Sequence, residues 1–406
     1  MPRSRILALI QAGGRGGRMD VLTRETPKPL LPFAGGFQLI DFPLSNLRNS
    51  GIDDVWLSVQ YLAQAVGDAV GNGKAWDLDR HYGGFKLLVP QEGGGELVDV
   101  GFADGNAEEL LRRRDLIREQ NPDALVVMSA DHVYRLDYVE VVTEHHRQQA
   151  ECTLVTTEVP REDAGHHVVV EADADGRVTR VTAKPAEPAS STVATEVFVY
   201  SPAVLIEVLE ELHRDLAGRP TPQSLGDFGE YLLPALVDRG RTHTFPLPGY
   251  WRDLGRPDTY VAAHRDLLTG QLTGIGDPSW PIRTNRPPRP PAYVSGQAQI
   301  TDSLVSGGCM IAGSVVRSVL GPGVHVEKGA TVRDCVLFPD AVVEPGAVVD
   351  WAVVADGSRI GSGARVGAPA DDQPPDDRMV LLGRQCVVGE RQVLAPGARL
   401  EPGTTA

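Results

Sequence analysis

A glycine-rich segment follows the first apolar run of the chain and has the composition of a phosphate-binding loop. It reads Gln11-Ala12-Gly13-Gly14-Arg15-Gly16-Gly17-Arg18. Glycine lets backbone N–H groups approach a polyphosphate closely, and two arginines can neutralise its charge. The segment matches neither the Walker pattern nor the G-x-G-x-x-G dinucleotide pattern. By itself it fits a phosphate site and a plain strand-to-helix turn equally well.

Alternating strand-like and helix-like segments surround this loop and have to position it. Short β-branched runs predict strands at residues 6–11, 54–60, 124–129 and 152–159, and apolar spacing predicts helices at 107–120 and 138–150. This alternation is typical of a Rossmann-like, mostly parallel α/β sheet that is covered on both faces. We therefore expect residues 1–275 to form an α/β domain, with the glycine-rich loop directly after its first strand.

The remainder of the chain differs in composition and in the spacing of its apolar residues. Residues 276–292 are rich in proline and predict a stiff, extended linker. In residues 293–406 apolar side chains recur six positions apart, at Leu320, Val326, Val332, then Val354, Ile360, Val366, then Val388, Leu394, Leu400. This spacing predicts a left-handed parallel β-helix of hexapeptide repeats, with an irregular β-sandwich as the alternative. The repeat slips between Val332 and Val343 and meets a polar interruption at 369–377.

Composition and charge narrow the class of function. The net charge of -15 and the pI near 5.1 argue against nucleic acid or an anionic membrane as partner. The four cysteines lack the spacing of a zinc site or a disulfide scaffold, so we expect reduced core thiols. The apolar run at 6–10 is too short for a membrane span and predicts a buried strand. These features predict a cytoplasmic protein that acts on small molecules.

Sequence blocks along nearly the whole chain resemble the ADP-glucose pyrophosphorylase (glucose-1-phosphate adenylyltransferase) family of sugar nucleotidyltransferases. In family order they are Thr26-Pro27-Lys28-Pro29-Leu30-Leu31-Pro32-Phe33, Leu39-Ile40-Asp41-Phe42-Pro43-Leu44-Ser45-Asn46, Asn49-Ser50-Gly51-Ile52, Ser129-Ala130-Asp131-His132-Val133-Tyr134, Lys184-Pro185, Asp227-Phe228-Gly229, Gly249-Tyr250-Trp251-Arg252-Asp253-Leu254-Gly255, Trp280-Pro281-Ile282-Arg283 and Ser303-Leu304-Val305-Ser306-Gly307-Gly308-Cys309. The resemblance implies that residues 1–275 join an NTP to a sugar 1-phosphate and release pyrophosphate. It also implies a homo-oligomer, a dimer or a tetramer.

The resemblance assigns roles to individual residues. Asp131 and Asp253 would hold the catalytic Mg²⁺, and Arg15, Arg18 and Lys184 would supply the catalytic cations. The nucleotide would be bound by Gly13, Gly14, Arg15, Gly16, Lys28, Gln91 and Glu92. The sugar phosphate would be bound by Gly105, Asn106, Lys184, Glu196 and Asp227. No general base is required, because the attacking phosphate is already ionised.

Four departures from the family pattern concern the sugar pocket. Gly105-Asn106-Ala107-Glu108-Glu109 stands where the family has Gly-Thr-Ala-Asp-Ala, Ala183-Lys184-Pro185 where it has Glu-Lys-Pro, Ala194-Thr195-Glu196 where it has Ser-Met-Gly, and His166-His167 where it has an aromatic-Gly pair. The metal and phosphate blocks are intact. We expect an acceptor that is still a phosphate ester but whose ring differs from glucose, with simple divergence among glucose enzymes as the alternative.

The identity of the nucleotide base is a separate question. Val89-Pro90-Gln91-Glu92 stands where the family has Pro-Ala-Gln-Gln. An ionised glutamate only accepts hydrogen bonds, which suits the N1–H and amino group of guanine better than the acceptor at adenine N1. GTP therefore stands beside ATP as a candidate substrate, and Glu92 as a merely solvated side chain is the alternative.

Three other functions compete with the sugar nucleotidyltransferase. The altered pocket and Glu92 together suggest a cyclitol-phosphate nucleotidyltransferase, similar to valienol-1-phosphate guanylyltransferases. A non-catalytic regulatory subunit is disfavoured because the metal and phosphate residues are present. Acyl transfer on the β-helix is the weakest, because His325 is the only histidine in that region.

Overall fold

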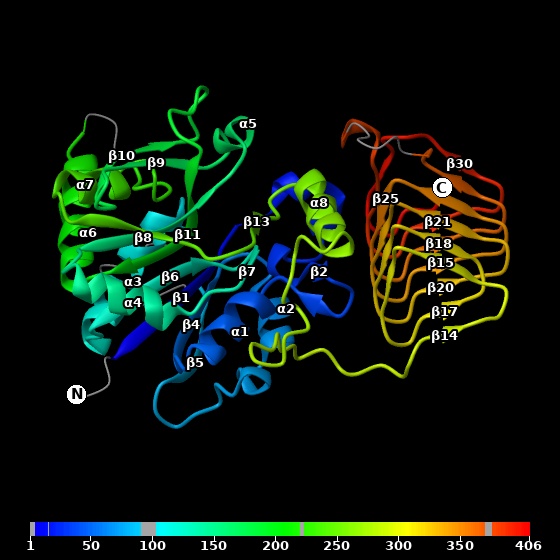
Figure 1. Cartoon of the computed structure of the whole chain (residues 1–406), viewed down its shortest axis with the longest axis horizontal. Helices are drawn as coiled ribbons and strands as arrows, with labels where there is room; N and C mark the ends of the chain where they lie inside the picture. Colours follow the sequence, from blue (N-terminus) through cyan, green and yellow to red (C-terminus); the bar gives the residue numbers. More distant parts are fainter. Residues whose placement is uncertain (1–4, 15, 91–102, 220–222, 370–375) are drawn as a thin grey trace.

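The computed structural model of the chain describes residues 5–14, 16–90, 103–219, 223–369 and 376–406. They form an α/β body that is followed by a coiled stack of short strands (Figure 1). Within these ranges, no helix is both long enough and apolar enough to cross a bilayer.

A nine-stranded sheet forms the centre of the α/β body. Its main path is β10-β9-β11-β6-β1-β4-β5, and β8 pairs with both β11 and β12. The strands are β1 Ile6–Ala12, β4 Asp54–Val59, β5 Gly84–Leu88, β6 Ala124–Ser129, β8 Cys152–Glu158, β9 Val168–Ala172, β10 Val178–Ala183, β11 Thr192–Tyr200 and β12 Thr242–Pro246. β1, β4, β5 and β6 are parallel, whereas β11 runs antiparallel to β6. The four strands predicted from the sequence are confirmed, each with ends that differ by at most one residue.

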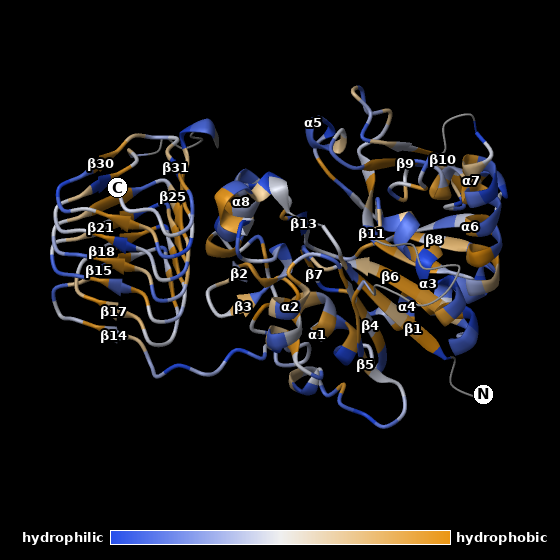
Figure 2. Ribbon diagram, turned by 180° about the vertical axis from the view of Figure 1, so that it is seen from behind, coloured by the Kyte–Doolittle hydropathy of each residue, from blue (hydrophilic) through white to orange (hydrophobic). Residues whose placement is uncertain are grey.

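Helices cover both faces of this sheet. The first strand requires this cover, because its side chains alternate between the two faces and are apolar on both. Leu7 and Leu9 of β1 pack in a core with α3, α6 and α7, whereas Ala8 and Ile10 pack in a second core with α1, α2 and α4. Hydrophobic colour follows these central strands in Figure 2. The helices are α1 Asp41–Asn49, α2 Ala63–Val70, α3 Asn106–Gln120, α4 Tyr138–Arg147, α5 Arg161–Ala164, α6 Pro202–Ala217, α7 Leu232–Asp238 and α8 Pro257–Leu268. α4 ends before the predicted residue 150 because Gln149 adopts a left-handed φ of 50°.

Several short elements complete the α/β body. The 3₁₀ turns, the last of them in the C-terminal part, are η1 Gly17–Thr23, η2 Lys28–Leu30, η3 Lys74–Trp76 and η4 Asp376–Arg378. β2 Pro32–Phe33 pairs with β3 Phe37–Gln38, and β7 His132–Tyr134 pairs with β13 Trp251–Asp253. The segment after α8 contains no helix or strand up to residue 292. It is held against α1, because Trp280 Nε1 donates to Asn46 Oδ1 and the backbone N–H of Arg283 donates to Ser45 Oγ, each over 2.9 Å.

The C-terminal part is a left-handed β-helix whose three sides are six-stranded parallel sheets. The first side contains β14 Tyr293–Val294, β17 Met310–Ile311, β20 His325–Val326, β23 Val342–Val343, β26 Arg359–Ile360 and β29 Val387–Val388. The second contains β15 Gln299–Thr301, β18 Ser314–Val316, β21 Thr331–Arg333, β24 Val348–Asp350, β27 Arg365–Val366 and β30 Val393–Leu394. The third contains β16 Leu304–Val305, β19 Val319–Leu320, β22 Val336–Leu337, β25 Ala352–Val354, β28 Val380–Leu382 and β31 Arg399–Leu400.

The pairing register explains the slip in the hexapeptide spacing. Leu320 pairs with Leu337, and Leu337 with Val354, so one rung takes 17 residues. The sides that end at Val326 and Val332 each take six residues, but the side from Val332 to Leu337 takes five. The slip is therefore a shorter side of the rung. The polar interruption predicted at 369–377 lies in a longer step, in which Val354 pairs with Leu382, and its residues 370–375 are outside the described ranges.

A shared apolar cluster joins the β-helix to the α/β body. Met19, Leu31 and Tyr260 of the body belong to the same buried cluster as Phe338 and Trp351 of the β-helix. The rings of Tyr260 and Phe338 lie edge to face with centroids 6.0 Å apart. The two parts therefore bury apolar surface against each other, in addition to being connected by the chain.

Truncation of Phe338 tests how much this cluster contributes to stability. Phe338 is 1% exposed, so Phe338→Ala should lower the free energy of unfolding by about 3–5 kcal/mol in urea titrations. Val393, 67% exposed on the same β-helix, provides the control, and Val393→Ala should change it by less than about 0.5 kcal/mol. Equal effects of the two substitutions would contradict a stabilising interface.

Candidate active site

A cavity of about 210 Å³ opens at the carboxyl ends of the parallel strands β1 and β6. β1 leads into the glycine-rich loop, and β6 leads into Asp131 through Ser129 and Ala130. The pairing of Gln11 with Ser129 sets these two ends side by side. The predicted site residues that line the cavity are Gly13, Gly14, Arg18, Lys28, Asn106, Asp131, Lys184, Glu196, Asp227 and Asp253. Residues from separate segments of the chain thus meet in one cleft.

The other predicted site residues lie beside the cleft or outside the described residues. Gly16 has a φ of 65°, and a Cβ there would come within 3.1 Å of Lys28 Cβ, so this glycine allows the loop to pack on Lys28. Gly105 has a φ of 102° and precedes α3, and a Cβ there would lie 2.2 Å from the Gly226 backbone. Arg15, Gln91 and Glu92 are outside the described residues.

Lys28 forms the centre of a buried charged cluster. Its ammonium group pairs with Asp131 Oδ2 and lies 3.7 Å from Asp253 Oδ1. Asp253 reaches this position because β13 pairs with β7, which sets Asp253 directly opposite His132. Side chains of directly opposite residues lie on the same face of a sheet. Two carboxylates that are distant in sequence therefore share one cation.

Burial and neighbouring charges shift the pKa values of this cluster in opposite directions. Burial would lower the pKa of Lys28, but Asp131 and Asp253 raise it above its ordinary value. Burial would raise the pKa of Asp131, but Lys28 and His132 hold it below its ordinary value. The pKa of Asp253 is likewise lowered by Lys28 and His132 against the effect of burial. Both carboxylates are therefore ionised at neutral pH, as metal ligands must be.

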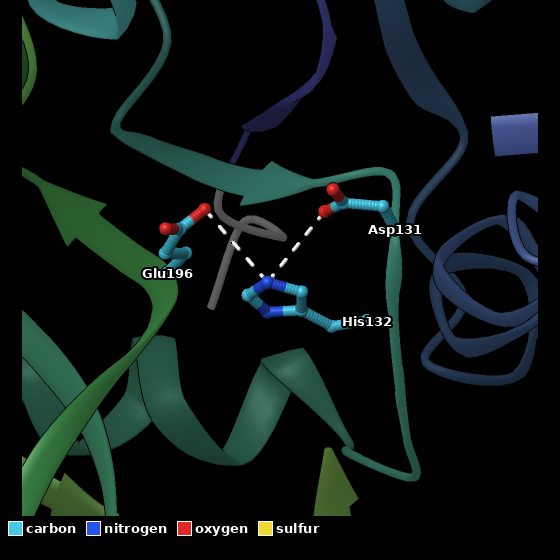
Figure 3. Close-up of side chains that lie close together, drawn as sticks. All are labelled: Asp131, His132 and Glu196. Carbon is cyan, nitrogen blue, oxygen red and sulfur yellow. Dashed lines mark ion pairs between the residues drawn. The ribbon is translucent and has the colours of Figure 1, made fainter. Parts of the chain in front are cut away.

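His132 is a site residue that sequence reasoning missed. Its Nε2 lies 3.5 Å from Asp131 Oδ1, 3.5 Å from Asp253 Oδ1 and 3.9 Å from Glu196 Oε2. Figure 3 shows the imidazole between Asp131 and Glu196. Burial would lower the pKa of His132, but the three carboxylates raise it above its ordinary value. The only signal in the sequence was its position next to Asp131.

The rim of the cleft carries the residues predicted to hold the acceptor. Lys184 Nζ lies 3.9 Å from Asp227 Oδ2, and both side chains are more than half exposed. Asp227 Oδ1 accepts a hydrogen bond from the backbone N–H of Asn106 over 3.3 Å, and the Asn106 carbonyl accepts one from Gln11 Nε2 over 3.0 Å. These contacts connect the rim through the start of α3 to the glycine-rich loop.

The carboxylates of the cleft fit a hard divalent cation. Mg²⁺ is typically bound through one or two carboxylates plus substrate phosphates. Asp253 Oδ1 is buried and has no hydrogen-bond partner among the described residues. A buried oxygen of this kind is costly unless a donor or a cation satisfies it. The donor set and this oxygen, which Lys28 Nζ approaches only to 3.7 Å, are both consistent with a metal beside Asp131 and Asp253.

Comparisons with known proteins agree with this geometry. Residues 7–270, which include all the residues of the cleft, match the family model described as nucleotidyl transferase. The chain belongs to the nucleotidyl transferase family. In this nucleotidyl transferase, residues 290–388 also match the model described as GlmU-like, C-terminal hexapeptide.

Curated relatives of this nucleotidyl transferase align with most of its length. Glucose-1-phosphate adenylyltransferase of Desulforamulus reducens is 35% identical over 341 residues, which cover 83% of each chain. Glucose-1-phosphate adenylyltransferase of Geobacillus stearothermophilus is 35% identical over 333 residues, 82% of this chain and 84% of that protein. Glucose-1-phosphate adenylyltransferase of Clostridium acetobutylicum is 34% identical over 336 residues, 82% and 86% of the two chains. The chain is accordingly an enzyme of the nucleotidyltransferase class.

Neutralising either carboxylate should disable this nucleotidyl transferase. Asp131→Asn or Asp253→Asn should lower turnover in a pyrophosphate-release assay by at least about 10²-fold, because each removes a charged oxygen from the metal position. Asp302→Asn, the same change at an exposed residue of the β-helix, is the control and should leave turnover unchanged. Near-normal turnover in both cleft variants would refute the assignment.

Proposed function

We propose that the chain transfers the nucleotidyl group of an NTP to a sugar 1-phosphate, or to a close mimic of one, and releases pyrophosphate. One observation carries the proposal: Lys28, Asp131, Asp253 and Lys184 line a single cleft directly beside Gly13 and Gly14. This cleft supports an active enzyme over a regulatory subunit. The deciding assay measures pyrophosphate release over a grid of four NTPs with hexose and cyclitol 1-phosphates.

The proposed reaction is an in-line displacement at the α-phosphorus. A phosphate oxygen of the acceptor forms a bond to the α-phosphorus, the bond to the bridging oxygen of the β-phosphate breaks, and its electron pair leaves with pyrophosphate. Asp131 and Asp253 would hold a Mg²⁺, which screens the repulsion between the two phosphate groups. The backbone at Gly13 and Gly14 would cradle the triphosphate, and Arg18 and Lys28 would stabilise the departing charge.

Lys184 would hold the phosphate of the acceptor. It lies at the rim of the cleft with a left-handed φ of 44°, and its N–H donates to the His167 carbonyl over 2.9 Å. These features direct a flexible cation over the opening, where its nearest anion is the exposed Asp227. An incoming phosphate can replace that weak surface pair, because exposed ion pairs contribute at most about 1 kcal/mol.

Removing the charge of Lys184 should weaken binding of the acceptor phosphate and leave binding of the NTP unchanged. Lys184→Gln should raise the KM for the sugar phosphate roughly 10- to 150-fold, the loss of a charge-assisted hydrogen bond of about 1.5–3 kcal/mol, with the KM for the NTP within about threefold of wild type. Lys328→Gln, at an exposed lysine of the β-helix, should change neither. Parallel increases in both KM values would count against this role.

The positions that differ from the family pattern gather around the acceptor side. Asn106 and Glu196 line the 210 Å³ cavity, and His166 and His167 line a second cavity of about 540 Å³. Arg18 and Asp253 belong to both cavities. His167 packs edge-on against Trp251 with ring centroids 5.3 Å apart. This clustering supports an acceptor ring other than glucose, for which a cyclitol 1-phosphate is the candidate.

The names of the relatives and the altered residues around the acceptor therefore point to different substrates. The relatives carry the name glucose-1-phosphate adenylyltransferase, which supports ATP and glucose 1-phosphate. Glu92 and the altered acceptor side support GTP and a cyclitol 1-phosphate. The substrate grid distinguishes the two possibilities directly. One predicts pyrophosphate release from ATP with glucose 1-phosphate, and the other predicts it from GTP with a cyclitol 1-phosphate.

A substitution at Glu92 tests the base independently. If Glu92 reads guanine, Glu92→Gln puts a donor against a guanine donor, which should lower kcat/KM for GTP roughly 5- to 150-fold, a loss of about 1–3 kcal/mol, while ATP use holds or rises. If adenine is the base, ATP use should stay unchanged and GTP use negligible in both proteins. Wild-type enzyme that releases no pyrophosphate from GTP with any acceptor would end the guanine hypothesis.

The proposal extends to the cellular compartment and the oligomeric state of the enzyme. It would act in the cytoplasm, in keeping with four buried cysteines that form no disulfide. It would assemble as a dimer or a tetramer. Exposed apolar side chains on the β-helix, namely Tyr293, Val294 and Met310, support self-association.

A further inference from the structure

Glu196 brings a third carboxylate to the Asp131 and Asp253 pair. It lies in β11, where the register with β8 shifts between Ala194 and Phe198, and its own backbone is left-handed, with a φ of 56°. This irregularity turns the carboxylate towards His132 (Figure 3). A left-handed φ is unfavourable for a residue with a Cβ. The carboxylate is therefore held in the cleft against the local backbone preference.

The imidazole of His132 is oriented as in a metal-binding histidine. Its Nδ1 lies 3.0 Å from the Thr195 carbonyl, which can only accept, so Nδ1 carries a proton. The ring also stands edge-on to Trp251, with centroids 5.3 Å apart. The side chain is 3% exposed, and Nε2 makes no hydrogen bond with any described residue. Fixing one ring nitrogen on a carbonyl is how proteins aim the other at a metal.

The cluster has a charge imbalance that a divalent cation would correct. Ligand atoms of Asp131, His132 and Glu196 all lie within 4.8 Å of one another, and Asp253 Oδ1 lies 3.5 Å from His132 Nε2. In the described part of the chain, Lys28 is the lysine that pairs with these carboxylates, through Asp131 Oδ2 and Asp253 Oδ1. Three carboxylates therefore share one lysine and the imidazole of His132. Asp131 Oδ1 faces His132 on the side that Lys28 does not use.

We propose that Asp131, His132 and Glu196, together with Asp253, form a site for a first-row divalent transition-metal ion that binds before the nucleotide does. A Mg²⁺ that arrives with an NTP needs one or two protein carboxylates, whereas this cluster offers three carboxylates and an imidazole. Imidazole nitrogen favours transition metals over Mg²⁺. The inference rests on the proposed function, because it extends the Asp131 and Asp253 pair.

Mn²⁺ is the probe, because its paramagnetism reports both occupancy and ligand type. The full chain, stripped of metal and without nucleotide, is titrated with Mn²⁺, and the free ion is followed by its electron paramagnetic resonance signal. One Mn²⁺ should bind, and Mg²⁺ should displace it only at a concentration at least about 10-fold higher. Pulsed electron paramagnetic resonance should detect ¹⁴N coupling from His132 Nε2.

Two substitutions and a matched control isolate the new ligands. Glu196→Gly suits the left-handed backbone and removes the side chain that carries the carboxylate, so it should weaken Mn²⁺ binding at least about 10-fold and retain the ¹⁴N coupling. His132→Gln should abolish that coupling. Asp302→Gly makes the same acidic-to-glycine change at a left-handed, exposed position, with a φ of 45°, and should leave Mn²⁺ affinity within about twofold of wild type.

The outcomes separate this inference from the proposed function. Absence of Mn²⁺ binding without nucleotide, absence of ¹⁴N coupling in the wild-type protein, or an unchanged affinity in Glu196→Gly would each overturn the inference. An imidazole that serves only as a protonated counter-ion gives the second of these results. If the chain binds Mn²⁺ as described but releases no pyrophosphate with any substrate pair, the metal site stands and the proposed function fails. If it releases pyrophosphate but shows none of the binding effects, the proposed function stands and the metal site fails.

Discussion

The parallel pairing of β1 with β6 is the constraint on which the site depends. It sets Gln11 beside Ser129, so the glycine-rich loop and Asp131 leave the sheet at the same edge. Both strands are buried on two faces, which fixes their register, because a slip by one residue would exchange the contents of the two cores. The other residues of the cleft reach this edge from segments that pack on the same sheet or pair with the strand that follows Asp131.

The strands and the β-helix could be predicted from the sequence because their signals are local. An uninterrupted apolar run such as the one in β1 has few alternatives to a central strand, and inward-facing side chains of a β-helix recur at a nearly fixed spacing. Leu320, Val326 and Val332 are all buried at the positions that the spacing predicted. The five-residue side from Val332 to Leu337 was visible in the sequence only as a slip in the spacing.

The remaining features of the site depend on contacts between distant segments. The sequence pattern pointed to Asp131 and Asp253 as separate motifs, but the nearness of His132 to Asp253 follows from the pairing of β7 with β13. Glu196 was predicted to bind the sugar phosphate, and the structure places its carboxylate 3.9 Å from His132 Nε2. That position depends on an irregular, left-handed backbone within β11, for which the sequence carries no signal of its own. Propensity would place glycine or asparagine there.

The 3₁₀ turn η1 connects the phosphate loop to the β-helix. Arg18, near its start, lines the cleft, while Met19, Val21 and Leu22 are buried in the cluster that includes Leu381 of β28. Arg399 adds a contact over 3.2 Å to Asp20 from the last rung. The two domains are consequently not interchangeable modules. A β-helix transplanted from a relative would have to bring a complementary surface for residues 17–23, or the turn that carries Arg18 to the cleft would lose its support.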